Sequence, residues 1–200
     1  MMEVFRLSTR TMAIEAANRI SDNFPPLSWP EPEVQARARL SRGAGRGVAS
    51  RASVAGLTGL QALQAMVDGE LPSSHIGHTL DFFLLEVAPG RAVFQGTPQT
   101  AHLNPMGGVH GGWYATLLDS AVGCAVHSLM PVGRGYTTAE LSVNLVRAAK
   151  ANGEPLRAIG QVIHCGRQLA TAEGRIVDAG GKVYAHATTT CLVFELPSGT

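Results

Sequence analysis

The chain has 200 residues, which is enough for one domain of ordinary size with a short appendage. Its formal net charge is only +1 at pH 7, and its Lys and Arg residues are scattered, so neither nucleic acid nor an acidic membrane is an expected partner. Aromatic residues make up 6% of the chain, which leaves few platforms for stacking bases, and the hydrophobic fraction of 45% is typical of a soluble globular domain.

Three cysteines, Cys124, Cys165 and Cys191, are an odd number and have no CxxC spacing. Each lies in an apolar run, where a free cysteine behaves as a small hydrophobic residue. This usage favours a reducing compartment. No apolar run approaches the length of a membrane span, and the first residues have no signal-peptide core, so we expect a cytoplasmic protein.

Residues 1–52 differ in composition from the rest of the chain. They hold a proline cluster at 24–32 and an Arg/Gly tract at 39–47, and only residues 12–20 have the spacing of a short helix. We therefore predict a flexible N-terminal extension, followed by a folded domain over 53–200. An organelle transit peptide and an overlong start-site assignment both stay open as explanations of the extension.

The folded part begins with a predicted helix over 57–67, where apolar residues recur at helical spacing until Gly69 ends the segment. Strand-like runs over 80–87 and 91–97 then flank a Pro-Gly turn, which predicts a β-hairpin. A long central helix follows.

Four further strand signals come after that helix: Tyr136–Arg147, Leu156–Cys165, Ala170–Val177 and Val183–Leu196. The connections between them are of hairpin size, which argues for an antiparallel sheet. A single helix that is too apolar for a surface argues that the sheet curls around it. The predicted fold class is α+β.

The central stretch, residues 104–130, carries the chemistry. A glycine-rich loop leads into an apolar segment from about His110 to Met130, which predicts a helix that is buried on nearly all sides. One carboxylate, Asp119, interrupts this segment. A carboxylate among small apolar groups is costly unless it is paired or used, so Asp119 is a catalytic candidate, with a capped or solvent-reaching Asp as the alternative.

The start of the same helix offers a second chemical group. The first N–H groups of a helix lack an intrahelical partner and carry the positive end of its dipole, and Gly111 and Gly112 have no side chains to keep a ligand away. Such an end polarises a carbonyl or holds an anion. Asp119 lies eight residues beyond Gly111, about 12 Å along the helix axis. If both groups act on one substrate, one must come from another subunit, which predicts an obligate dimer with shared active sites.

The motif at the start of this helix resembles that of a known family. The run Asn104-x-x-Gly107-x-x-His110-Gly111-Gly112-x-x-x-x-Leu117-x-Asp119 is similar to the signature of hot-dog-fold acyl-CoA thioesterases of the phenylacetate-degradation (PaaI-like) type. Segments 136–145, 166–167 and 182–188 resemble later strands of that family, and the resemblance covers residues 54–197. It implies a curved antiparallel sheet wrapped around one long buried helix.

The resemblance also implies a role for each site residue. Asp119 is the expected catalytic carboxylate, acting as general base on water or as nucleophile, while the Gly111 N–H polarises the thioester carbonyl. Asn104 is expected to orient the water or the carbonyl, His110 to shape the loop and Thr138 to position the water. The implied substrate is an acyl-CoA, with no metal and no cofactor beyond the coenzyme A of the substrate. The implied assembly is a homodimer or homotetramer with active sites at the subunit interface.

Several of these residues have plainer interpretations. Asn104 can simply set a turn, His110 can be structural, and Thr138 is a common strand residue. Three basic residues could contact the coenzyme A phosphates, although a solvated charge is the simpler interpretation of each one: Arg147, Lys150 and Arg167. Other side chains could line an acyl pocket or equally fill the core: Phe82, Phe83, Met106, Trp113 and Tyr114. The other histidines show no zinc-ligand spacing.

Three other functions stay open at this stage. Hot-dog hydratases and dehydratases use a His and an acid as a proton-transferring pair, and His110 with Asp119 supplies both. A non-catalytic acyl-CoA-binding module can also use this fold, although an intact Asp119 argues against it. A serine hydrolase is more distant, because the chain contains no G-x-S-x-G elbow.

Overall fold

The computed structural model describes residues 33–197, and the predictions that concern residues 1–32 lie outside this range. The helices are α2 (Glu33–Arg42), α3 (Arg51–Val54), α4 (Gly59–Asp68), α5 (His75–Thr79), the 3-10 helix η2 (Thr100–His102) and α6 (Gly111–His127). The strands are β1 (Phe82–Ala88), β2 (Arg91–Gly96), β3 (Arg134–Leu145), β4 (Leu156–Cys165), β5 (Leu169–Val177) and β6 (Val183–Glu195). The predicted helix over 57–67, the hairpin, the central helix and the four later strands are confirmed.

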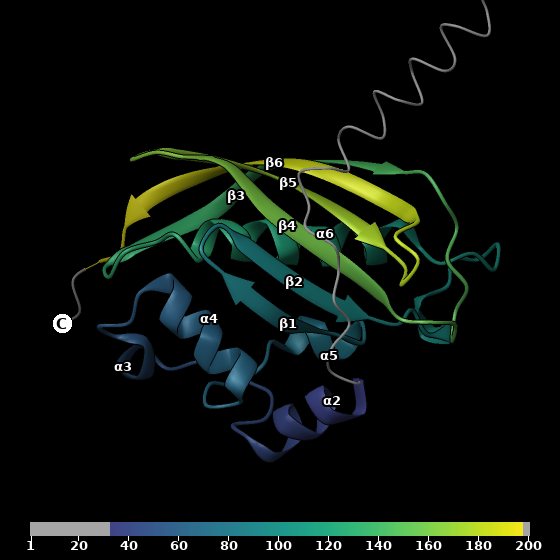
Figure 1. The fold of residues 1–200 in the computed structure, drawn as a ribbon, viewed down its shortest axis with the longest axis horizontal. Helices are drawn as coiled ribbons and strands as arrows, with labels where there is room; N and C mark the ends of the chain where they lie inside the picture. The colour runs from purple at the N-terminus through teal and green to yellow at the C-terminus, as the bar shows by residue number, and fades with distance from the viewer. Residues whose placement is uncertain (1–32, 198–200) are drawn as a thin grey trace, which may run out of the picture. The chain divides into compact units, whose positions relative to one another are not determined.

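The strands of the described residues form one six-stranded antiparallel sheet in the order β1-β2-β4-β5-β6-β3. Figure 1 shows the strands curving over α6, which lies along the inner side of the sheet. Strands β1 and β3 form the two edges. This is the predicted α+β hot-dog architecture, with the sheet wrapped around the central helix.

Helix α6 is buried because its side chains are apolar on most sides. Trp113, Leu117, Leu118 and Val122 are each at most 2% exposed. They pack against apolar side chains of the sheet, including Phe94, Ala158, Ile176, Ala185 and Ala187. The aromatic candidates for an acyl pocket are mostly part of this core: Phe82 and Phe83 on β1, and Trp113 and Tyr114 on α6. Met106, in contrast, is 92% exposed.

One stripe of α6 is less covered than the rest. The residues along it are half-buried: Ala115, Thr116, Asp119, Ser120, Cys124 and His127. The hydroxyl groups of Thr116 and Ser120 donate back to helix carbonyls, at 2.8 Å to Gly112 O and 2.8 Å to Thr116 O. These two polar side chains are therefore satisfied locally, and Asp119 is the charged group that faces outward from the core.

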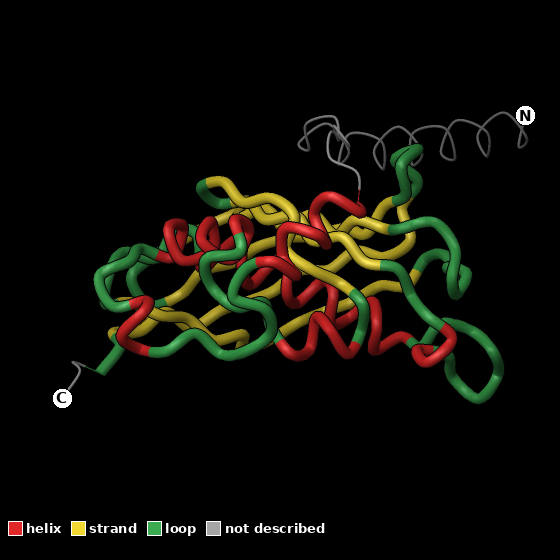
Figure 2. The backbone as a smooth tube through the Cα atoms, turned by 90° about the horizontal axis from the view of Figure 1, so that it is seen from below, coloured by secondary structure: helices red, strands yellow, loops and turns green. Residues whose placement is uncertain are grey.

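The N-terminal helices extend the folded domain to residues before the predicted boundary at residue 53. Helices α4 and α5 pack against β1, and α2 packs against α4. These helices lie below the strands in Figure 1 and therefore in front of them in Figure 2, which is seen from below. Arg39 Nε donates to Val67 O at 2.9 Å, and Ala44 N donates to Gly69 O at 2.8 Å. Residues from 33 onward thus belong to the same compact unit as the sheet.

The described residues contain no helix that is long and apolar enough to cross a membrane. Within the same range, no group of three or more His, Cys, Asp or Glu side chains is arranged to hold a metal ion.

Candidate active site

The glycine-rich loop before α6 is a turn held by Asn104. The Asn104 Oδ1 accepts hydrogen bonds from Met106 N at 2.9 Å and Gly108 N at 3.1 Å. Gly107 has a φ of 82°, a left-handed conformation that favours glycine. Both hydrogen bonds of the Asn104 side-chain oxygen hold the loop, as expected for a residue that sets a turn.

His110 is the N-cap of α6. Its Nδ1 accepts from Gly112 N at 2.9 Å, and its carbonyl accepts from Trp113 N at 2.9 Å. The N–H of Gly111, the residue before these two donors, meets no hydrogen-bond acceptor within residues 33–197. A Cβ added at Gly111 would touch only the Leu145 side chain, at 3.0 Å. The helix therefore begins with a backbone donor at the positive end of its dipole, beside the last residue of β3.

Asp119 is held by a residue of the edge strand. Thr138 Oγ1 on β3 donates to Asp119 Oδ1 at 2.9 Å. The register of β3 against β6 shifts between Thr138 and Glu140, which leaves Ala139 as a bulge residue. Bulges re-aim side chains and are frequent beside active sites. Here Thr138 lies opposite the fully buried Cys191 of β6, and it reaches the carboxylate on the helix.

The groups around Asp119 are kept in their protonated forms. Burial, and secondarily the charge of Asp119, raises the pKa of the Cys124 thiol to about 12. Burial also raises the pKa of Tyr136 and, with smaller opposing hydrogen bonds from Thr189 and Thr138, that of Cys191. These thiols and the phenol are therefore poor nucleophiles at neutral pH, because the thiolate is the reactive form of cysteine. Among these neighbouring side chains, the carboxylate of Asp119 is the group that suits acid–base or nucleophilic chemistry.

Gly111 and Asp119 do not meet within one chain. They lie eight residues apart on the same segment of α6, about 12 Å along its axis. His110 Nδ1 is likewise engaged with Gly112 and not with the carboxylate. A single chain thus presents two half-sites, an N–H donor near Leu145 and a carboxylate near Thr138, at different points along β3.

The basic candidates lie at opposite ends of β3. Arg147 and Lys150 are exposed beyond its last residue, and Arg147 Nε donates to Val183 O at 3.3 Å. Arg167 is exposed in the turn between β4 and β5, where its carbonyl accepts from Arg134 Nη2 at the start of β3. Within one chain, Arg167 therefore does not share a site with the other two.

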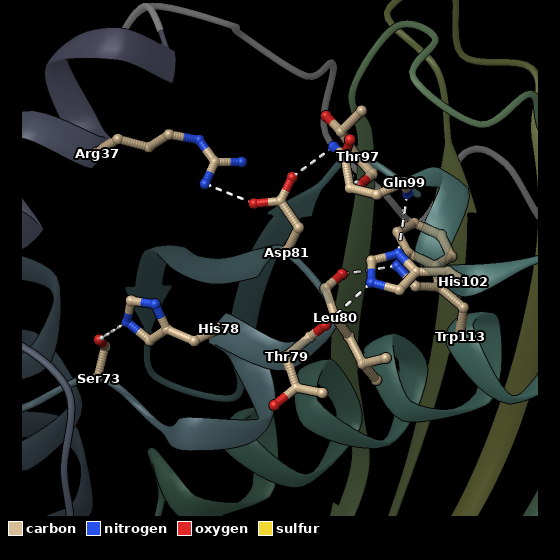
Figure 3. Close-up of polar contacts among 10 residues, drawn as sticks. All are labelled: Arg37, Ser73, His78, Thr79, Leu80, Asp81, Thr97, Gln99, His102 and Trp113. Atoms are coloured by element: carbon tan, nitrogen blue, oxygen red, sulfur yellow. Dashed lines mark hydrogen bonds and ion pairs between the residues drawn. The ribbon is translucent and has the colours of Figure 1, made fainter.

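A polar cluster that sequence reasoning missed positions the loop before α6 (Figure 3). Asp81, in a left-handed conformation with φ 54°, pairs with Arg37 of α2 at 2.7 Å and accepts from Gln99 Nε2 at 2.7 Å. Gln99 N donates to His102 Nδ1 at 2.9 Å. Trp113 Nε1 of α6 donates to the carbonyl of the residue before Asp81 at 2.8 Å. These bonds join α2, the loop and the start of α6. They run between residues of different elements, so no local motif revealed them.

Known proteins resemble this domain in sequence and fold. Residues 106–185 match the family model described as the Thioesterase superfamily. A mutant of phenylacetic acid degradation protein PaaI from Thermus thermophilus is 28% identical, with a TM-score of 0.53, over 58% of this chain and 96% of that chain. A hypothetical thioesterase protein from Streptococcus pneumoniae, solved with coenzyme A, is also 28% identical, with a TM-score of 0.53, over 59% of this chain and 92% of that chain.

A curated protein of Halobacterium salinarum, named as an inferred esterase, is 35% identical over 91 residues. The match covers 44% of this chain and spans only 58% of the length of that relative. Together with the fold, these similarities show a hot-dog domain that resembles the thioesterase superfamily over residues 106–185 and has PaaI-like structural relatives. The predicted resemblance is confirmed.

Proposed function

We propose that this chain, whose hot-dog domain resembles the thioesterase superfamily over residues 106–185, hydrolyses acyl-CoA thioesters to the free acid and coenzyme A. The observation that carries the proposal is the 2.9 Å hydrogen bond from Thr138 Oγ1 to Asp119, on the half-buried stripe of α6. This bond orients a carboxylate beside an edge strand. A relative of the same fold has been solved with coenzyme A, which supports a coenzyme A thioester as substrate.

The chemistry suits these two groups. Attack on the thioester develops negative charge on the carbonyl oxygen, and a fixed N–H donor such as that of Gly111 stabilises this charge. Asp119 either takes the proton of the attacking water as general base, or attacks the carbonyl carbon and forms an anhydride that water then hydrolyses. In both routes the C–S bond breaks, and coenzyme A leaves as a thiolate that takes a proton from solvent.

The two half-sites require a second copy of the chain. We propose a homodimer in which β3 pairs antiparallel with its copy, because β3 is an edge strand with open backbone groups. A pairing that sets Thr138 opposite the partner's Leu145 brings Asp119 of one copy to the partner's Gly111 N–H. Each site then contains one group from each subunit. Two such dimers would form the homotetramer implied by the resemblance.

The same pairing gives the basic residues a shared role. It moves Arg167, which lies near the start of β3, toward the partner's Arg147 and the partner's Lys150, which lie beyond its end. Three cationic side chains at one mouth of the site would bind the phosphates of coenzyme A. We also propose a cytoplasmic location, because all three cysteines of the chain are free thiols, as expected in a reducing compartment.

A hot-dog hydratase is the second candidate, and the contacts of His110 make it the weaker one. Its Nδ1 already accepts the Gly112 N–H as a helix cap, which restricts the imidazole from acting as a mobile proton carrier with Asp119. A non-catalytic acyl-CoA-binding module would have no need of an oriented carboxylate at this position.

The test is thiol release from a panel of acyl-CoAs by the wild type, Asp119→Ala, Asp119→Asn and Thr138→Val. We expect the Asp119 variants to lose about a thousandfold in kcat, and Thr138→Val about tenfold, because the carboxylate reacts and Thr138 only orients it. Asp68→Asn, which removes an exposed carboxylate on α4, is the matched control and should stay within about twofold.

Circular dichroism establishes that each variant is folded. Absence of thiol release by the wild type across the panel, or full activity of folded Asp119 variants, would contradict the proposal. Binding without turnover would favour the binding module, and water addition to an enoyl-CoA would favour the hydratase.

A further inference from the structure

A cavity of about 710 Å³ lies at the C-terminal end of α6. Its walls come from the loop between α3 and α4, from α4, from the turn after α6 and from the end of β6; they include Leu57, Met66, His127, Val132, Arg134 and Leu196. Ligand pockets in proteins measure about 300–1,000 Å³. Most of this wall lies outside residues 106–185, the part that matches the family model.

The cavity lies at the end of the helix stripe that carries Asp119. Residues four apart share a helix stripe, so Asp119, Gly123 and His127 follow one another along α6. Alternate residues of β3 face them, starting with Thr138, which donates to Asp119 at 2.9 Å. The next is Tyr136: a Cβ at Gly123 would lie 2.7 Å from its hydroxyl oxygen, and its ring centroid is 5.6 Å from that of His127.

The next residue along the helix stripe and the next alternate residue of β3 both lie in the cavity wall. His127 ends the helix stripe and Arg134 begins β3, and both line the cavity. The path from Asp119 to His127 covers eight residues of helix, or about 12 Å. Glycine occupies the middle of the stripe and the Tyr136 hydroxyl packs directly against it, so the Tyr136 ring stands between Asp119 and the cavity.

Two residues of the wall each hold a buried polar atom. His127 Nδ1 and Arg134 Nε are inaccessible to solvent and have no hydrogen-bond partner among residues 33–197. Burial lowers the pKa of His127, so its imidazole is neutral at pH 7 and is compatible with an uncharged chain.

We propose that this cavity receives the distal part of the acyl chain, and that Tyr136 lies at its entrance as the residue that selects chain length. The proposal rests on the proposed thioesterase function and names its substrate class. An acetyl group would end beside Asp119, whereas a medium or long acyl chain would pass Tyr136 and reach the apolar wall formed by Leu57, Met66 and Leu196. Preferred substrates are therefore acyl-CoAs whose chains extend more than about 12 Å past the thioester.

The test measures kcat/KM for acetyl-, hexanoyl-, octanoyl-, decanoyl- and lauroyl-CoA in the full-length wild type and in variants that fill the cavity. Leu57→Trp and Val132→Trp place a large ring in it. Val132 is 51% exposed, so its substitution should leave folding intact. The matched control is Ile76→Trp, at a position that is 48% exposed and outside the cavity wall.

We expect the wild type to prefer decanoyl-CoA to acetyl-CoA by about tenfold or more, since each buried methylene adds binding energy. Both cavity variants should lose about tenfold on decanoyl- and lauroyl-CoA while keeping acetyl-CoA turnover within about twofold, and Ile76→Trp should match the wild type. An unchanged chain-length profile in the cavity variants would overturn the cavity proposal while the thioesterase function stands. Failure of the wild type to release thiol from any acyl-CoA would overturn both.

Discussion

The two ends of α6 are built in opposite ways. At the N-terminal end, a glycine-rich loop and the His110 cap leave the Gly111 N–H available to a ligand. At the C-terminal end, α4 closes on the helix: Gly59 N donates to Met130 O at 2.9 Å, and a Cβ at Gly59 would lie 1.8 Å from the carbonyl oxygen of His127. The comparison shows that the two ends of one helix have different surroundings: a backbone donor without a partner among residues 33–197 at one end, and a partly open cavity beside α4 at the other.

Gly59→Ala should have the largest effect on stability. The added methyl group meets backbone at the closed end, which cannot move aside as a side chain can, so we expect a loss of about 3 kcal/mol in the free energy of unfolding. The comparison variant is Gly111→Ala at the open end, where the methyl group meets only the flexible end of Leu145; its cost should be under about 1 kcal/mol. Urea denaturation measures both, and equal costs would contradict the contrast between the two ends.

His110→Ala should have an intermediate effect. It removes the side-chain acceptor of the Gly112 N–H, and loss of an N-cap costs about 1 kcal/mol. His110→Asn should restore most of that stability, because asparagine is a favoured cap. Urea denaturation of the three proteins, paired with thiol release, checks the prediction. A loss of activity in folded His110→Asn as large as that in Asp119→Ala would instead show that His110 transfers a proton.

The pH dependence of stability should show the smallest effect, which comes from one half-buried imidazole at the closed end. Burial places the pKa of His127 in the folded chain below its ordinary value of 6.5. The unfolded chain therefore binds more protons as the pH falls through that range, and the free energy of unfolding decreases. We expect His127→Gln to weaken this decrease between about pH 7.5 and about pH 5.5, measured by urea denaturation. Exposed His186→Gln is the control, and identical profiles for wild type and His127→Gln would contradict the prediction.

Sequence patterns predicted the regular part of the fold well. The apolar segment from His110 onward became α6 with His110 as its cap, and the Pro-Gly turn became the β1–β2 hairpin. Helix α2, which lies before the predicted boundary at residue 53, was missed because Glu33–Arg42 carries many charged side chains and no clear apolar stripe. This helix is stabilised by contacts with distant residues, such as the ion pair from Arg37 to Asp81, which local periodicity does not reveal.

The sequence by itself determined the α+β class, the position of Asp119 on the central helix and the glycines at its start, because helical and strand periodicities and turn residues act over a few positions. The hot-dog class came from the resemblance of the motif at 104–119 to a known family. Tertiary structure alone decided that Thr138 meets Asp119, that Arg167 lies at the opposite end of β3 from Arg147, and that a cavity continues the stripe of Asp119. These facts depend on strand register, on a bulge at Ala139 and on how α4 packs against α6. Such long-range geometry is set by the packing of the whole domain, and no local pattern encodes it.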